Sequence, residues 1–229
     1  MNTVVERLSR KVSDSESQQI REQTLILESL REKTESLSSQ QWEEGFSRLA
    51  PYRLTSSGTL KKGDVESWQQ ANLYAAQKIQ AEQDPAWNDI LNLNALLLKA
   101  PQAEIRTTSI YLGPREACHP HLLAETLGYF SEHILPSQKH ANALVAAALC
   151  QYWLVSLHPF MDANGRTAVL LADWILGRNG YLPMSFATKL DAIVATLEDD
   201  RASATAANAI LKLLKNVQRS YRLILGEEI

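Results

Sequence analysis

The sequence is poor in glycine and proline, and this scarcity indicates its fold class. Its 229 residues include 9 glycines, about 4% of the chain, where soluble proteins average about 7%. It has only 8 prolines. A chain with so few helix breakers forms few tight turns and long regular elements, and its abundant Ala, Leu, Gln and Glu favour helices over strands. We therefore expect an all-α fold.

Charge, hydropathy and cysteine content exclude several other classes of protein. With 23 basic and 26 acidic residues, the chain lacks the positive field that nucleic-acid binding needs. No apolar run approaches the roughly 20 residues of a membrane span, and the segment 1–17 lacks the apolar stretch of a secretory signal. Cys118 and Cys150 form no C-x-x-C pair, so we expect buried thiols in a reducing compartment. The predicted location is the cytoplasm, and delivery to another cell remains open.

Helical periodicity covers most of the chain, and one helix stands out as the core. We expect helices over 13–36, 39–50, 64–80, 85–100, 119–134, 138–156, 165–179, 187–198 and 202–225. Pro51 is expected to close the second helix, and Pro85 to occupy the first helical position of the fourth. The stretch Ala141–Leu157 is almost entirely apolar and is therefore predicted to lie at the centre. Only Glu104–Leu112 is typical of a β segment.

We predict two parts of the chain: an N-terminal helical extension over 1–55 and a catalytic core with C-terminal helices over 56–229. The extension carries an amphipathic helix that presents one apolar stripe. It is a candidate regulatory segment.

Polar residues follow directly after the most apolar helix. The segment 158–167 reads H-P-F-M-D-A-N-G-R-T. Pro159 keeps His158 out of helical conformation and ends the helix, which places an imidazole at the mouth of the core. Phe160 is predicted to anchor the loop. An imidazole in this position is suited to accept a proton near neutral pH.

The same segment contains the parts of an anion site. Asn164 is expected to cap the next helix, whose first N–H groups and dipole attract anions. Arg166 adds a permanently charged phosphate ligand, and Asp162 adds a carboxylate suited to Mg²⁺. A base, an anion site and a metal carboxylate together indicate group transfer from a nucleoside di- or triphosphate.

This stretch resembles the active-site loop of the Fic/Doc family, whose pattern is H-P-F-x-[DE]-G-N-G-R. Eight of the nine positions from His158 to Arg166 fit the pattern. The resemblance extends over about residues 87–184 and includes Arg106–Ile110, which is similar to the family's flap, and Gly180–Pro183 after the motif helix. It implies a Fic-like helical bundle with a short β-hairpin flap.

The family resemblance implies a protein adenylyltransferase, a nucleotidyltransferase that moves AMP from ATP to a hydroxyl of a target protein. His158 would act as the general base, and Asp162 would hold Mg²⁺ on the phosphates of ATP. The implied phosphate-binding residues are Ala163, Asn164, Gly165 and Arg166. The implied flap residues are Thr107, Thr108, Ser109 and Ile110. The flap would bind an extended segment of the target by strand addition, with Ile110 as a candidate clamp.

Two departures from the family pattern leave the donor open. Ala163 stands where most members have glycine, and its methyl group fits only if the backbone there has a negative φ. Val169 stands where many adenylylating members carry a second arginine that holds the γ-phosphate. A Doc-like protein kinase acting as a toxin, or a transferase using another diphosphate donor, is therefore an alternative, although Gly165 departs from the Doc pattern. A further alternative is a catalytically weak Fic-fold module that binds peptides.

Other features carry weaker hypotheses about regulation and partners. The segment Thr24–Glu28 fits part of the family's inhibitory pattern [ST]-x-x-x-E-[GN], which makes Glu28 a candidate inhibitory residue. An antitoxin or another regulator is a candidate partner. The apolar stripe of the last helix, Ile210, Leu213, Leu214 and Val217, indicates packing or a homodimer face. Cys118–His121 contains metal-type ligands without a third nearby, so we expect surface residues there. No nucleic-acid or membrane partner is expected.

Overall fold

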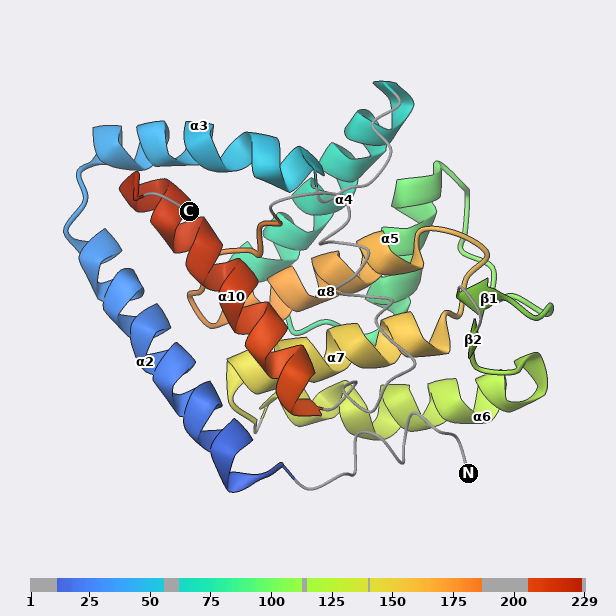
Figure 1. Ribbon diagram of the computed structural model, residues 1–229. Helices are drawn as coiled ribbons and strands as arrows, with labels where there is room; N and C mark the ends of the chain where they lie inside the picture. Colours follow the sequence, from blue (N-terminus) through green and yellow to red (C-terminus); the bar gives the residue numbers. More distant parts are fainter. Residues whose placement is uncertain (1–11, 56–61, 113–114, 140, 187–205, 228–229) are drawn as a thin grey trace.

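The computed structural model describes residues 12–55, 62–112, 115–139, 141–186 and 206–227, and most of these residues are helical (Figure 1). The helices are α2 (Asp14–Glu35), α3 (Ser39–Thr55), α4 (Lys62–Gln80), α5 (Trp87–Leu98), α6 (Pro120–Tyr129), α7 (Ala143–Leu157), α8 (Asn164–Arg178) and α10 (Ala206–Leu225). Helix α6 continues into a π-helical turn, η1 (Phe130–Ile134), and a 3₁₀ turn, η2 (Pro136–Lys139). The predicted all-α class is confirmed. Within the described residues, no helix has both the length and the apolar character that crossing a membrane requires.

Helix α7 is the centre of the fold, as its composition predicts. Its side chains are buried on nearly every face, and α8 and α10 pack directly against it (Figure 1). The run Ala146–Ala148 has only methyl side chains, which allows neighbouring helices to approach closely. Asn142 caps the helix, since its side-chain oxygen accepts a hydrogen bond from the Leu144 N–H at 2.9 Å. Because α7 is buried, the loop that follows it begins inside the core.

The N-terminal helix α2 packs along α10 and shares the main core. A capping box between Ser13 and Glu16 starts the helix, so the predicted boundary at residue 13 is close to the observed one. Leu27 and Leu30 are buried in the same hydrophobic cluster as α7 and α8. The division at residue 55 stays a prediction.

Helix boundaries near prolines differ from those expected. Pro51 lies inside α3 instead of ending it. The turn before it is held by α10, because Arg48 donates hydrogen bonds to the carbonyl oxygens of Leu223 (2.8 Å) and Ile224 (2.6 Å). Gly45 allows this contact, since a Cβ there would lie 2.8 Å from the Ile224 carbonyl oxygen.

The next two helices also start away from the expected residues. Helix α5 begins at Trp87, because the Asp89 carboxylate accepts the Ala86 N–H at 2.9 Å and sets the N-terminus there instead of at Pro85. Helix α4 begins at Lys62, before the expected cap at Asp64. The helix predicted over 187–198 lies outside the described residues.

The predicted β segment is mostly extended chain without a ladder. Among the described residues, strand pairing joins only β1 (Tyr111–Leu112) to β2 (Arg115–Glu116), antiparallel. An isolated bridge also pairs Ile105 with Phe160 of the motif loop. The expectation of a strand over all of Glu104–Leu112 is therefore wrong in extent. The segment runs past helices, which offer no open backbone groups for a longer ladder.

Candidate active site

The motif loop connects the C-terminus of α7 to the N-terminus of α8. His158 adopts the left-handed conformation (φ 50°, ψ 58°), and its N–H donates to the Leu154 carbonyl oxygen at 3.0 Å. Pro159 disfavours right-handed helix at the residue before it, so the chain leaves α7 at this point, as predicted. Phe160 is fully buried and stacks on Trp87 at 6.4 Å between ring centroids. The aromatic stack confirms that Phe160 anchors the loop.

The His158 imidazole is arranged as a neutral base. Its Nδ1 lies 3.3 Å from the Val155 carbonyl oxygen, which only accepts hydrogen bonds, so Nδ1 carries the proton and Nε2 is left as the acceptor. Burial lowers the pKa of His158 below its usual 6.5, and the charge of Arg106 lowers it further. The Val155 carbonyl and the Asp162 carboxylate oppose this shift in the pKa. The neutral, proton-accepting form is therefore favoured at neutral pH.

Asn164 braces the loop instead of capping the helix. Its side-chain oxygen accepts the Phe160 N–H at 2.9 Å, and its side-chain nitrogen donates to the Phe160 carbonyl oxygen at 2.8 Å. The residue is buried at the first position of α8. The expected cap is thus wrong, because the amide group is occupied by the backbone four residues earlier. Its role as a phosphate ligand stays a prediction.

Ala163 occupies the N-cap position of α8 with a left-handed backbone (φ 62°, ψ 11°). The expectation of a negative φ is wrong: the tight entry into α8 requires the left-handed region, and the alanine adopts it. No side-chain hydrogen bond caps the helix at this residue. The N–H groups of Gly165 and Arg166 lie in the first turn, where a helix provides no partners of its own. A Cβ on Gly165 would meet nothing within 4 Å, so the space beside its Cα is open.

Exchange of Ala163 for glycine is expected to stabilise the protein. A left-handed alanine costs about 1–2 kcal/mol, and glycine removes most of that cost while adding freedom to the unfolded chain. We expect a gain of about 1 kcal/mol or less in the free energy of unfolding, measured by urea denaturation. Ala168→Gly, in the interior of α8, is the matched control and should lose about 1 kcal/mol. A loss of stability in Ala163→Gly would contradict the claim that the left-handed backbone of Ala163 is strained.

Asp162 and Arg166 lie side by side at this helix end. Asp162 Oδ1 accepts the Ala163 N–H at 2.5 Å, and Oδ2 lies 3.7 Å from Arg166 Nη2. The Asp162 side chain is 73% exposed, whereas that of Arg166 is only 18% exposed. Magnesium is commonly held by one carboxylate together with substrate phosphates, and an accessible Asp162 fits that use. In the described part of the chain, no three His, Cys, Asp or Glu residues gather into a metal-binding group.

Asn94 reaches the motif loop from α5 and is a site residue that sequence reasoning missed. The side chain is buried, and its nitrogen donates to the Asp162 carbonyl oxygen (3.0 Å) and to Thr167 Oγ1 (3.2 Å). Thr167 in turn donates to the Ala163 carbonyl oxygen at 2.9 Å. An amide in the apolar stretch W-N-D-I-L-N-L-N-A-L-L-L was the available signal, since buried polar groups need partners.

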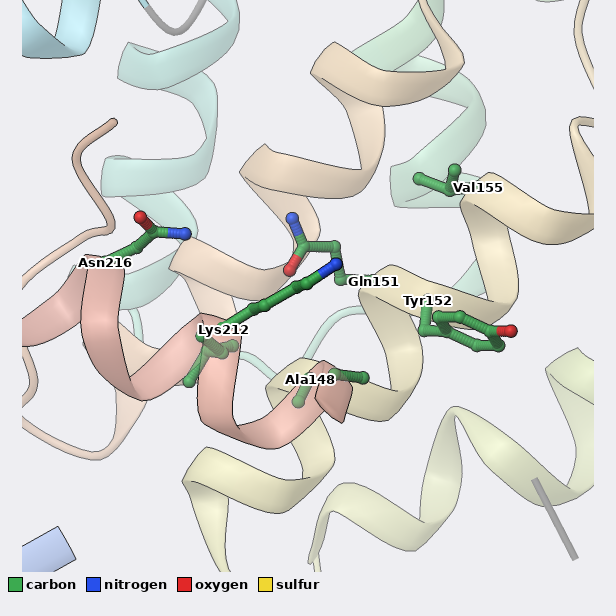
Figure 2. A pocket seen from close by; sticks show the side chains of 8 residues that line it. Ala148, Gln151, Tyr152, Val155, Lys212 and Asn216 are labelled. Atoms are coloured by element: carbon green, nitrogen blue, oxygen red, sulfur yellow. The ribbon is translucent and has the colours of Figure 1, made fainter. Parts of the chain in front are cut away.

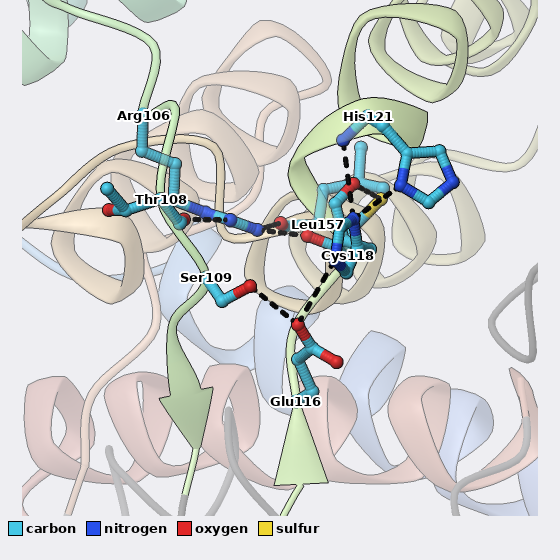
Figure 3. A network of polar contacts seen from close by, with 8 residues as sticks. Arg106, Thr108, Ser109, Glu116, Cys118, His121 and Leu157 are labelled. Carbon is cyan, nitrogen blue, oxygen red and sulfur yellow. Dashed lines mark hydrogen bonds and ion pairs between the residues drawn. The ribbon is translucent and has the colours of Figure 1, made fainter.

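The four predicted flap residues lie beside the loop and are tied to their surroundings differently. Thr107, Thr108 and Ser109 are exposed. Thr108 Oγ1 lies 3.6 Å from Met161 Sδ, and Ser109 Oγ donates to Glu116 Oε1 at 2.7 Å (Figure 3). The Ile110 carbonyl oxygen accepts the Ala117 N–H at 2.9 Å. The structure thus places the segment next to the motif loop, and its role as a flap stays a prediction.

Glu28 is held by residues outside the motif. Its carboxylate accepts the Tyr181 hydroxyl at 2.7 Å and lies 3.7 Å from Arg31 Nη1, while the Arg31 guanidinium stacks over the Tyr181 ring. Burial, followed by the Glu28 carboxylate, raises the pKa of Tyr181 to about 12, which keeps the hydroxyl protonated as a donor. Val169 is buried in the core. These contacts favour a packing role for Glu28, and its inhibitory role stays a hypothesis.

Glu28→Ala and Tyr181→Phe remove the same hydrogen bond from opposite ends. If the contact is structural, each variant should lose about 1 kcal/mol of unfolding free energy, measured by urea denaturation, and keep the wild-type transfer rate. A rise in transfer activity in Glu28→Ala, with no rise in Tyr181→Phe, would instead establish inhibition by the carboxylate.

Three further expectations are resolved away from the loop. Cys118 and Cys150 are buried thiols that form no disulfide, as predicted, and burial raises the pKa of the Cys150 thiol to about 12. His119 and His121 are exposed at the start of α6, as expected, with their Nδ1 atoms 2.5 Å apart, whereas the expectation of a surface residue is wrong for the buried Cys118. The apolar stripe of α10 is buried in the core, which supports packing and not a homodimer face. Its residues are Ile210, Leu213, Leu214 and Val217.

A small pocket lies between α7 and α10 and is separate from the motif residues. Figure 2 shows Gln151 and Lys212 pointing toward each other across it, with Tyr152, Val155 and Asn216 around them. None of the predicted site residues lines this pocket. The candidate active site is therefore the motif loop.

The comparisons with known proteins point to the same loop. The model of the Fic/DOC family matches residues 86–176. A "Protein adenylyltransferase Fic" from Drosophila grimshawi is 40% identical over 103 residues, which are 42% of this chain and 21% of that protein. A "Uridine 5'-monophosphate transferase" from Xanthomonas campestris pv. campestris (strain 8004) is 30% identical over 176 residues, 67% of this chain and 33% of that protein.

The fold likewise matches solved structures. Fic-1 from C. elegans superposes with a TM-score of 0.69 at 22% identity, over 92% of this chain and 73% of that one. IbpAFic2 covalently tethered to Cdc42 gives a TM-score of 0.63 at 18% identity, over 95% and 75% of the two chains. The chain spans only about a fifth to a third of the length of these curated relatives.

Proposed function

The chain belongs to the Fic/DOC family through residues 86–176, and on that premise we propose that it is a nucleotidyltransferase that moves AMP from ATP to a hydroxyl of a target protein. The observation that carries the proposal is a half-buried His158, whose lowered pKa favours the neutral ring, on the same short loop that leads into the N-terminus of α8. Relatives that share the matched region are named protein adenylyltransferases. A binding module would have no use for a base at an anion site.

In the proposed reaction, His158 Nε2 accepts the proton of a target serine, threonine or tyrosine hydroxyl. The hydroxyl oxygen bonds to the α-phosphorus of ATP, the bond to the β-phosphate bridging oxygen breaks, and pyrophosphate leaves. Because Nδ1–H is directed at the Val155 carbonyl oxygen, the ring presents Nε2 to the target. Formation of the imidazolium is made easier by the Asp162 carboxylate, which favours the protonated ring.

The developing phosphate charge would be met by residues at the start of α8. The N-terminus of α8 favours anions, and it presents the open N–H groups of Gly165 and Arg166. The Arg166 side chain adds a positive charge at the same end of the helix. Magnesium held by Asp162 would neutralise charge on the phosphates. The flap residues 107–110 would hold the target segment beside the loop.

Uridine nucleotides are a second candidate donor. The relative named uridine 5'-monophosphate transferase aligns over two thirds of this chain, farther than the adenylyltransferases reported above. Val169 is apolar and buried, so the chain lacks a second arginine at the position where many adenylylating members carry one. Both donors would use the same base and the same anion site.

Label transfer distinguishes the donors and the reaction types. The protein is incubated with Mg²⁺, a cell lysate and ATP or UTP labelled at the α- or γ-phosphate, with His158→Ala as the control. Label from α-labelled ATP that depends on His158 supports the proposal, and preference for α-labelled UTP supports uridylyl transfer. Transfer of the γ-label would indicate a kinase, and no His158-dependent label from either nucleotide would refute nucleotidyl transfer.

A further inference from the structure

Arg106 is a buried cation whose hydrogen bonds all go to the backbone. Its side chain is 3% exposed, and its Nε donates to the His158 carbonyl oxygen at 2.6 Å. Nη1 donates to the Thr108 carbonyl oxygen at 2.7 Å, and Nη2 donates to those of Leu157 (3.2 Å) and Cys118. The guanidinium fork therefore joins the end of α7, the flap segment and the chain before α6.

The backbone of the same residue adds a further link. The Arg106 N–H donates to the Pro159 carbonyl oxygen at 2.9 Å, and the neighbouring Ile105 forms its bridge with Phe160. Three consecutive carbonyl groups of the catalytic turn, 157–159, are thus held by this one arginine. A shift of the segment 105–108 would move the turn that carries the base.

Burial of the Arg106 charge costs free energy unless each of these carbonyl groups stays in hydrogen-bonding position. No described carboxylate forms an ion pair with Arg106. Burial lowers the pKa of its guanidinium, and the charge of the more distant Glu116 carboxylate raises it. A buried charge without a charged partner must be compensated by well-placed dipoles. Lysine offers a single ammonium and cannot reproduce a planar fork that reaches three segments. The geometry is therefore specific to arginine.

We propose that Arg106 is a positioning residue that fixes the backbone of His158 to the flap segment, so that base and target-binding segment form one rigid unit. Its consequences for catalysis rest on the proposed function, whereas its effect on His158 does not. The charges acting on the His158 ring are Arg106, which disfavours protonation, and Asp162, which favours it. Loss of Arg106 removes the first of these and loosens the burial of the ring.

The test compares Arg106→Met and Arg106→Lys with Arg48→Met. Arg48 also donates to two backbone carbonyl groups, but these lie on α10, so it controls for the loss of such bonds elsewhere. Each variant is measured for thermal unfolding, for kcat and KM of nucleotide transfer, and for the pH titration of His158 by NMR of labelled histidines. The chain has 5 histidines, and His158→Ala assigns the resonance.

We expect Arg106→Met to raise the pH midpoint of His158 and to lower kcat on the order of 10²-fold, with a smaller change in the KM for nucleotide. Arg106→Lys keeps the charge and should lose at least about tenfold in kcat. Arg48→Met should lower the melting temperature and leave the His158 midpoint unchanged.

If Arg106→Met does not fold, the same measurements on Arg106→Lys decide the test. A folded Arg106 variant with wild-type kcat and an unchanged His158 resonance would overturn the proposal. If the wild type transfers no nucleotide, the proposed function fails, and the His158 midpoint still tests this inference.

Discussion

Substitution of His158 by alanine is expected to lower the rate of nucleotide transfer by about 10²–10⁴-fold, the usual contribution of a general base. The residue ends α7 with its Nδ1 engaged by the Val155 carbonyl, which leaves its Nε2 as the proton acceptor. The rate is measured with saturating nucleotide and a fixed amount of target. His133→Ala, an exposed histidine on η1, is the matched control and should keep the wild-type rate. A His158→Ala variant that retains the wild-type rate would exclude His158 as the base.

The pH dependence of the reaction follows from the same environment. Burial lowers the pKa of His158 below 6.5, so the neutral base persists to more acidic pH than for a free imidazole. The acid limb of kcat/KM should therefore lie below pH 6.5 and be absent in His158→Ala. Because the unfolded state binds this proton more readily than the folded state, stability should decrease as pH falls through the unfolded pKa. An acid limb above pH 6.5 would contradict the assigned environment.

Removal of Arg166 is expected to have the second largest effect. Arg166→Ala should lower kcat/KM by about 10²–10³-fold, because it deletes the one side-chain cation of the motif at the open end of α8. Arg166→Lys should fall between the wild type and Arg166→Ala, since it keeps the charge but loses the two-pronged contact. The variants are compared by nucleotide titration calorimetry and by the transfer rate.

Arg178 provides the control at the other end of the same helix. Its side chain pairs with Asp84 at 3.6 Å, away from the motif loop. Arg178→Ala removes a charge from the same helix and should leave nucleotide binding unchanged. Equal losses in Arg166→Ala and Arg178→Ala would show that the effect comes from damage to α8 and not from phosphate recognition.

Much of the helical fold and the location of the site could be predicted from local patterns. The apolar run before the motif predicted the central helix α7, because a helix that is apolar on all faces has nowhere else to lie. Pro159 predicted the exit of His158 from helical conformation. The order of histidine, carboxylate and arginine along nine residues indicated the candidate site without reference to the fold.

What local patterns missed depends on contacts between distant segments. The left-handed Ala163 was not foreseen, because the backbone there is imposed by the loop around it, which Asn94 holds through the neighbouring carbonyl of Asp162. A strand was overpredicted over Glu104–Leu112, since its composition favours β structure but only two residues find a partner strand. Arg106 looked like one flap residue among several, and only the folded chain shows it bonded to the carbonyl groups of Leu157 and His158.

The chemical identity of the modification on a target residue tests the account most directly. A lysate is treated with ATP, UTP and Mg²⁺ together with the wild type or His158→Ala, and modified peptides are compared by mass spectrometry. The account predicts a nucleoside monophosphate joined to serine, threonine or tyrosine oxygen in the wild-type sample and its absence with His158→Ala. A bare phosphate on those residues, or the same nucleotide adduct in both samples, would contradict it.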